Sequence, residues 1–388
     1  MHPACSIRQS TRITGLICLL LVASVAVAQP PEEIAAQIES LSSDSYLRRE
    51  NATEWLLNAG PAAIDPLVEV LERGDLETTQ RAIRILHAIA VNSPIIEGER
   101  GQPKLATRDP NTPDPWETLL QLSTMGGSRG ERATMAVEEI TQVRRVQTVQ
   151  TLSLQGALIG IQEFVYGARS ELASVVEISD AFQGDDSLLQ LLRWVDKIEY
   201  ARVEGSAIRP DVLRGVVQMP DLKTLSLLYG ELDEETLKVI GDLSSIDHLE
   251  FRYVTLNDEM LDSVAKLPIR ISLTLNGTDV TKDRVDALRQ TLPGLKIEYK
   301  FGGFLGVRCN DTLNECIIQS VVDGSGAQAA GLRTGDVIIS ADGNAIKRFA
   351  DLQAVINTHT PGESLEIGYR RNRVEFQTKA KLGKMTEP

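Results

Sequence analysis

The chain has 388 residues, of which 42% are hydrophobic, 24% charged and 4% aromatic. This length predicts two to four domains, and the composition excludes collagen, coiled coil and wholesale disorder. A net charge of −14 argues against nucleic acid as a partner, and four histidines and four cysteines are too few for a zinc cluster or a cysteine framework. We therefore expect no metal and no cofactor.

The first 28 residues predict a secretory signal peptide. Arg8 and Arg12 precede an apolar run over 13–28, which ends in the small-x-small sequence Ala26-Val27-Ala28. We expect cleavage after Ala28 and an exported product, periplasmic, at the cell surface or secreted, with no integral membrane segment. The alternative is a retained membrane anchor, although about sixteen apolar residues fall short of a comfortable span.

Residues 31–150 predict helices, because apolar residues recur at intervals of three and four. A related motif returns three times, at Arg49, at Arg81-Ala82 and at Arg132-Ala133, and a proline-rich loop over 92–115 interrupts it. The pattern resembles the HEAT repeat family, which implies helix pairs stacked into an α-solenoid. A plain helical bundle is the alternative.

Residues 151–300 predict a second array, clearest over 198–300, in which strands and helices alternate with a period of 24 residues. The strand centres are Leu225-Ser226-Leu227, Leu249-Glu250-Phe251, Leu273-Thr274-Leu275 and Ile297-Glu298-Tyr299. The L-x-x-L-x-L spacing resembles leucine-rich repeats, an α/β solenoid, which implies that the outer residues of each triplet stack into one apolar column. We expect the middle residues Ser226, Glu250, Thr274 and Glu298 to face outward along a concave surface, either as a binding face or as a merely solvated one.

Residues 301–384 change pattern again, to short strands separated by glycine-rich turns. Three segments stand out: Gly303-Phe304-Leu305-Gly306-Val307, the run from Ala329 to Ile338, and Thr360-Pro361-Gly362-Glu363. Together they resemble an α+β PDZ domain of the type found in exported serine proteases of the high-temperature-requirement family.

This resemblance implies peptide capture by strand addition. The loop containing Phe304 would offer the backbone N–H groups of Leu305, Gly306 and Val307 to a terminal carboxylate, and the peptide would pair with Val307-Arg308-Cys309. A helical register counted back from Pro361 predicts Asp351, Val355 and Thr358 on the groove side of the facing helix. The alternative is a domain that only packs, with an empty groove.

Cys309 and Cys316 flank a turn-rich stretch between two predicted strands. Antiparallel pairing around it would bring the two residues opposite each other, and in an exported protein we expect a disulfide there. Two buried thiols are the alternative.

These modules predict a non-enzymatic scaffold that binds proteins or peptides. The catalytic half of the protease family carries a Gly-Asn-Ser-Gly-Gly nucleophile loop with an upstream His and Asp, whereas Gly126-Gly127-Ser128-Arg129-Gly130 lacks the glycine pair after its serine. We expect no catalytic residues. The alternatives are an accessory, substrate-presenting subunit of an envelope protease and a divergent serine protease; the sequence predicts no oligomeric state.

Overall fold

The computed structural model describes residues 31–92, 95–97, 103–105, 114–166, 169–312 and 315–385, so the predicted signal peptide lies outside the described residues. The chain forms two compact units. Unit 1 combines the residues up to Ala90 with Pro110–Ala136, and unit 2 combines Val91–Asp109 with Val137–Pro388. Within the described ranges, no helix is both long and apolar enough to cross a membrane.

Unit 1 is helical. Its helices are α1 (Pro31–Ser40), α2 (Tyr46–Ala59), the 3₁₀ turn η1 (Gly60–Ala63), α3 (Ile64–Arg73), α4 (Leu76–Val91), α5 (Pro115–Ser123) and the first turns of α6 (Gly127–Leu154). Helix α5 begins where the side chain of Asp114 accepts a hydrogen bond from the Trp116 N–H at 2.9 Å, with Pro115 in the first turn. Leu56, Leu67 and Leu86 are fully buried between the helices. The helical prediction is confirmed, whereas the HEAT-like pairing stays a prediction.

The predicted proline-rich loop contains a short antiparallel pair, β1 (Ile95–Glu97) and β2 (Pro103–Leu105), which belongs to unit 2. The Leu105 N–H donates to Ser187 Oγ at 3.1 Å, which ties this pair to the chain 82 residues later.

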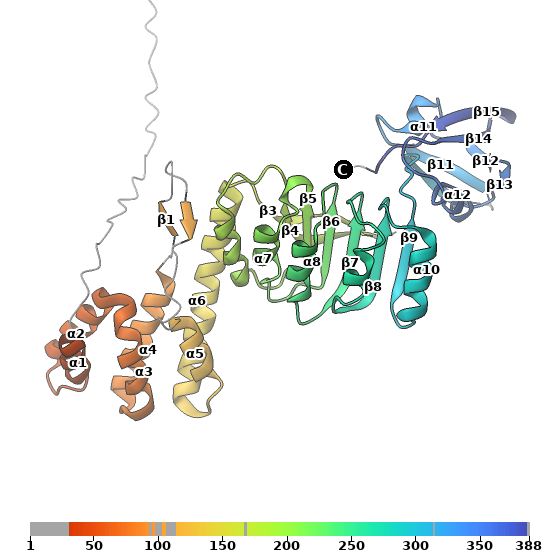
Figure 1. The fold of residues 1–388 in the computed structure, drawn as a ribbon. Coiled ribbons are helices and arrows are strands. Elements are labelled where there is room, and N and C mark those ends of the chain that lie inside the picture. The colour runs from red at the N-terminus through yellow and green to blue at the C-terminus, as the bar shows by residue number, and fades with distance from the viewer. Residues whose placement is uncertain are drawn as a thin grey trace, which may run out of the picture. The chain divides into compact units, whose positions relative to one another are not determined.

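The first part of unit 2 is a seven-stranded sheet in the order β3 to β9 (Figure 1). Its strands are β3 (Leu158–Tyr166), β4 (Arg169–Ile178), β5 (Tyr200–Glu204), β6 (Thr224–Leu228), β7 (Ile246–Arg252), β8 (Ile269–Asn276) and β9 (Lys296–Lys300). The connecting helices are η3 (Asp186–Trp194), η4 (Gly205–Ala207), α7 (Pro210–Val216), α8 (Glu234–Gly241), α9 (Leu261–Val264) and α10 (Lys282–Thr291). Strands β4 to β9 are parallel, and Leu225, Leu249, Leu273 and Ile297 stand opposite one another. Residues 24 positions apart in the sequence therefore pair on neighbouring strands, so the period sets the register of the sheet.

Each of four consecutive strands is followed directly by a residue with a left-handed backbone, at the same position of the period. These residues are Gly205 (φ 62°), Tyr229 (φ 57°), Tyr253 (φ 55°) and Gly277 (φ 64°). The N–H groups of the last three donate to the carbonyls of Arg252, Asn276 and Lys300 at 2.8–3.0 Å. Each turn is thereby fixed to the strand of the next repeat.

The prediction of an open concave surface is wrong for three of its four residues. Ser226, Glu250 and Thr274 are 0%, 2% and 3% exposed, whereas Glu298 is partly exposed. The cause is the antiparallel hairpin β3–β4. Its two strands pair with each other over their whole length, but only Val175–Ile178 of β4 pairs with the next strand of the sheet, β5. The remainder lies over the sheet and shields its polar residues from water.

Three contacts show how the hairpin lies on the sheet. The ring of Phe164 lies 5.0 Å from that of Tyr200, and the ring of Tyr166 lies 5.2 Å from that of His248. Arg252 donates from Nη2 to the carbonyl of Val165 at 2.9 Å. Arg252 also pairs with Glu250 at 2.9 Å, and both side chains are almost fully buried.

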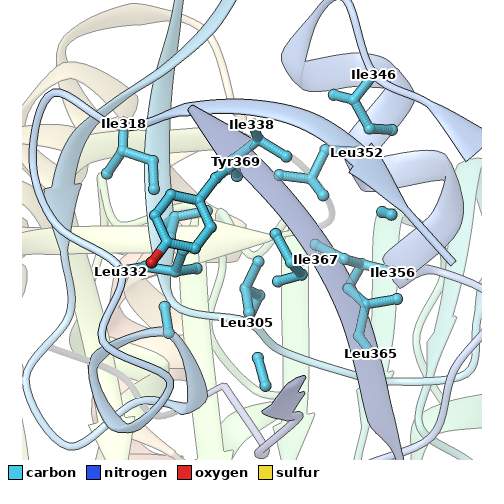
Figure 2. Packing of buried hydrophobic residues seen from close by; sticks show 14 of the residues in the cluster. Leu305, Ile318, Leu332, Ile338, Ile346, Leu352, Ile356, Leu365, Ile367 and Tyr369 are labelled. Carbon is cyan, nitrogen blue, oxygen red and sulfur yellow. The ribbon is translucent and has the colours of Figure 1, made fainter. Parts of the chain in front are cut away.

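The C-terminal domain of unit 2 is a six-stranded antiparallel sheet in the order β10-β11-β12-β14-β15, with β13 paired to β12. Its elements are β10 (Val307–Thr312), β11 (Glu315–Val321), α11 (Gly326–Ala329), β12 (Val337–Ala341), β13 (Asn344–Ala345), α12 (Phe349–Ile356), β14 (Ser364–Arg371) and β15 (Val374–Lys381). Figure 2 shows its core, in which Leu305, Ile338, Leu352 and Ile367 converge.

The register of β10 and β11 contradicts the predicted disulfide. The strands continue to Thr312 and restart at Glu315, so the connection is shorter than the predicted loop, and Cys309 faces Ile318 while Cys316 faces Asp311. Diagonal neighbours of this kind lie about 7–8 Å apart, beyond the roughly 4.4–6.8 Å between the Cα atoms of a disulfide. The structure contains both residues as thiols.

We predict two titratable thiols in a chain that begins at residue 31, which carries only Cys309 and Cys316. The measurement is a thiol titration of the denatured, unreduced protein. In the native protein Cys316 should react slowly, because it is fully buried, whereas Cys309 is only half-buried. A denatured protein with no titratable thiol would contradict the register described above.

We also predict that Glu250→Gln lowers the free energy of unfolding by about 3 kcal/mol, because the substitution leaves the guanidinium of Arg252 buried without its carboxylate. Urea denaturation measures this change. The matched control is Asp247→Asn, which breaks a 3.4 Å pair with an Arg270 side chain that is 65% exposed and should cost less than about 1 kcal/mol. Equal losses in the two variants would show that the Glu250–Arg252 pair is not shielded from solvent.

Candidate peptide-binding site

The loop from Gly303 to Val307 is held by its side chains and carbonyls. The Leu305 side chain is 1% exposed within the core, and the carbonyls of Leu305 and Gly306 accept hydrogen bonds from Ala327 and Val322 at 2.9 Å. Within the described part of the chain, the N–H groups of Leu305 and Gly306 have no backbone acceptor. The loop therefore presents two adjacent amide donors on its outer side, an arrangement suited to a carboxylate.

Gly306 allows this geometry in two ways. Its φ of 84° is a conformation that side-chain-bearing residues rarely adopt. A Cβ atom at this position would also lie 2.2 Å from Cβ of Ser325. Only glycine fits here without displacing the start of α11.

Strand β10, which follows the loop, is an edge strand with one side open. Val307 stands opposite Val321, and the flanking bond from Val322 N–H to Gly306 O makes this a non-hydrogen-bonded pair. The N–H and C=O of Val307 therefore point away from β11, toward the open side. An added strand could bond to them directly.

A pocket of about 310 Å³ lies beside this edge. Gly303, Phe304, Leu305, Gly306, Val307 and Arg308 line one side. The residues of the helical side are Phe349, Gln353, Ile356 and Asn357. The structure thus brings together all five residues that the sequence predicts from the loop and β10, Phe304 to Arg308.

The three residues predicted from the helix lie on its other flank, so this part of the prediction is wrong. The carboxylate of Asp351 accepts from the backbone N–H groups of Lys347 and Arg348 at 3.1 and 2.9 Å, and these bonds hold its pKa below the ordinary value. Val355 packs against the core, and the Thr358 hydroxyl donates to the Val355 carbonyl at 2.7 Å. All three line a separate depression.

The sequence locates the buried stripe of this helix correctly, since Leu352 and Ile356 are buried. It does not distinguish the two flanks of that stripe. Which flank faces β10 depends on the path by which the chain enters α12, and the apolar spacing along the helix carries no information about that path. Gln353 is an exposed polar residue, so no apolar pattern marks it as part of a pocket.

Residues 303–382 match the family model described as PDZ domain. The C-terminal domain is a PDZ domain. Over 76 residues it is 32% identical to the periplasmic pH-dependent serine endoprotease DegQ of Escherichia coli, a match that spans 20% of this chain and 17% of that protein.

Among solved structures, the chain is similar to an HtrA-type protease AlgW with a decapeptide, at 21% identity and a TM-score of 0.22, over 28% of this chain and 36% of that one. It is also similar to the HtrA3 PDZ domain bound to a phage-derived ligand, at 22% identity and a TM-score of 0.19, over 21% of this chain and 84% of that one.

Proposed function

We propose that this chain is an exported, non-enzymatic scaffold whose PDZ domain captures peptide segments or C-termini by strand addition. The observation that carries the proposal is the open edge of β10 beside a pocket whose loop offers the N–H groups of Leu305 and Gly306. The peptide pairs with the outward backbone groups of Val307 and continues along β10, while its last side chain enters the pocket.

The strength of such binding can be bounded. About four backbone hydrogen bonds at ~1 kcal/mol net each, together with one buried apolar side chain at ~2 kcal/mol, give roughly 6 kcal/mol before the cost of ordering the peptide. This corresponds to dissociation constants of about tens of micromolar or weaker. The site suits transient recognition.

The other modules of this proposal are interaction surfaces. The pairing of strands at intervals of 24 residues supports leucine-rich repeats over 198–300, and the helices α1 to α6 support HEAT-like repeats over 31–150. Repeat arrays offer extended surfaces suited to protein partners. The proposal includes no catalytic residue in either array.

A second candidate function is that of an accessory subunit that presents substrates to an envelope protease. The similarity to DegQ, a periplasmic endoprotease, favours this candidate and is consistent with export, although it spans only 76 residues and 17% of that protein. The two candidates differ in the partner and not in the chemistry of the pocket.

The deciding experiment is a peptide-library screen against the whole mature chain, in which every sequence is offered with a free and with an amidated C-terminus. We expect selection of apolar C-terminal residues and weaker binding of the amidated forms, because the loop donors then lose their anionic acceptor. Absence of any selection would contradict peptide capture and favour a domain that only packs.

We predict that Gln353→Trp abolishes binding of the peptide that the screen selects, because the indole fills the pocket from its helical wall. Thr358→Trp is the matched control, since Thr358 is also exposed and follows α12 closely, but lines the separate depression. Fluorescence anisotropy with the labelled peptide measures both affinities. If only the Thr358 variant loses binding, the peptide lies on the flank of α12 that the sequence predicts, and the pocket described here is not the binding site.

A further inference from the structure

Two tyrosines at the strand ends of the seven-stranded sheet have an unusual backbone. Tyr229 and Tyr253 have φ values of 57° and 55°, whereas glycine occupies the equivalent positions 205 and 277. Glycine adopts this conformation without strain, and a bulky residue there is an outlier. Contacts of the two aromatic side chains must therefore offset the strain.

Those contacts reach both ends of the PDZ domain. The Tyr253 hydroxyl donates to the carbonyl of Gly302 at 2.7 Å, where the chain enters the domain. The same oxygen accepts from the N–H of Met385 at 2.9 Å, where the chain leaves it after β15. One buried hydroxyl thus holds the entry and the exit of the domain at the edge of the sheet.

Tyr229 supports the same contact. Its ring stacks on that of Tyr253 with 5.3 Å between centroids and an interplanar angle of 16°, and its hydroxyl donates to the carbonyl of Met385. The ammonium of Lys384 lies 5.4 Å from the centroid of the Tyr253 ring. Two hydroxyls and one aromatic face therefore act on two residues of the C-terminal tail, Lys384 and Met385.

The Tyr253 ring also fits closely between two backbone turns. A Cβ atom on Gly277 would lie 2.5 Å from its Cδ1, and one on Gly302 would lie 2.9 Å from its Cε1. Tyr253 itself is 7% exposed, and burial raises the pKa of its phenol, which keeps the hydroxyl protonated and able to donate. The contact is a closed packing arrangement rather than a surface hydrogen bond.

This contact has a consequence for the peptide pocket, because part of the pocket wall comes from the sheet and its hairpin. Tyr253, Asn276 and Lys300 lie at the strand ends, and Val165 and Ser170 lie on the β3–β4 hairpin. Arg308 on the edge strand β10 also lies 3.9 Å from Glu163 of the hairpin. The volume of about 310 Å³ is near the lower end of the range for ligand pockets.

We propose that Tyr253 is the positioning residue of a two-part binding site, in which the hairpin and the strand ends form the second wall of the PDZ pocket around the last residues of the peptide. The inference rests on the proposed function. Since a peptide in the pocket contacts both parts, its binding and the docking of the PDZ domain on the sheet stabilise each other.

The first measurement requires no peptide. Hydrogen exchange is followed in the mature full-length chain and in its Tyr253→Phe, Tyr229→Phe and Tyr299→Phe variants. Tyr299 is the matched control, because its hydroxyl donates to Val280 O at 2.7 Å in the connection between β8 and α10, and it does not line the pocket.

We expect exchange at 302–306 and 383–385 to rise by about tenfold in the Tyr253 variant. In the Tyr229 variant the rise should be smaller and confined to the tail, and in the Tyr299 variant it should be absent from both segments. Equal exchange in the wild type and the Tyr253 variant, or a rise spread evenly over the whole chain, would overturn the positioning role.

The second measurement uses the tightest-binding labelled peptide from the library screen, shortened in steps from ten residues to three. We expect Tyr253→Phe to weaken binding of the three-residue form by about tenfold and that of the ten-residue form by less, since only the short form depends wholly on the two-walled pocket. Tyr299→Phe should leave both affinities unchanged.

Unchanged or tighter binding in the Tyr253 variant would overturn the two-part site, because the sheet would then be indifferent to the peptide or would obstruct it. If the wild type binds no peptide at all, the proposed function and the two-part site both fail. The exchange measurement still decides whether Tyr253 positions the domain.

Discussion

The amide donors of the loop face outward because the rest of the loop is bound from within the domain. The Leu305 side chain lies in the core. The carbonyls of Phe304 and Leu305, which share their peptide units with the N–H groups of Leu305 and Gly306, accept hydrogen bonds from the N–H groups of Gly383 and Ala327. A peptide unit whose carbonyl is fixed on one side must present its N–H on the other, because the unit is planar. The apolar packing of Leu305 therefore sets the direction of the polar groups that a ligand would meet. The edge strand β10, the pocket and the facing helix are placed around these donors.

The hairpin β3–β4 changes what the seven-stranded sheet can do. A parallel sheet with helices on one face would leave its other face to solvent, and polar residues at Ser226, Glu250 and Thr274 would suit that position. Here the hairpin covers them, and Arg252 bridges the two layers by bonding Glu250 beneath and the Val165 carbonyl above. The sheet thus acquires a buried polar layer, in which charges must be paired because they have lost their water.

The features of the fold that can be predicted from the sequence are those that depend on a repeated or regularly spaced pattern of residues. The 24-residue period becomes the register of the parallel strands, and the apolar stripe of α12 is buried as its spacing requires. The hairpin could not be predicted from that period, because it occurs once and pairs antiparallel. Turn lengths and the path of the chain decide which flank of α12 faces β10, and they also decide the offset between Cys309 and Cys316. The spacing of apolar residues carries no information about either. The strained tyrosines follow the period, yet only backbone angles distinguish them from ordinary strand-end residues.

Strand addition has a consequence for selectivity. Hydrogen bonds to the backbone of β10 are available to almost any extended peptide, so they contribute affinity without discriminating among sequences. Discrimination must come from the side-chain pocket, in which the PDZ domain supplies the loop and the helix. The remaining wall is supplied by Tyr253, Asn276, Lys300 and the hairpin. These residues lie outside the segment 303–382 that matches the PDZ family. If those residues meet the peptide, selectivity in this protein is a property of two folded parts that Tyr253 and the contacts around it hold together, and the isolated PDZ domain would bind a broader set of sequences than the whole chain.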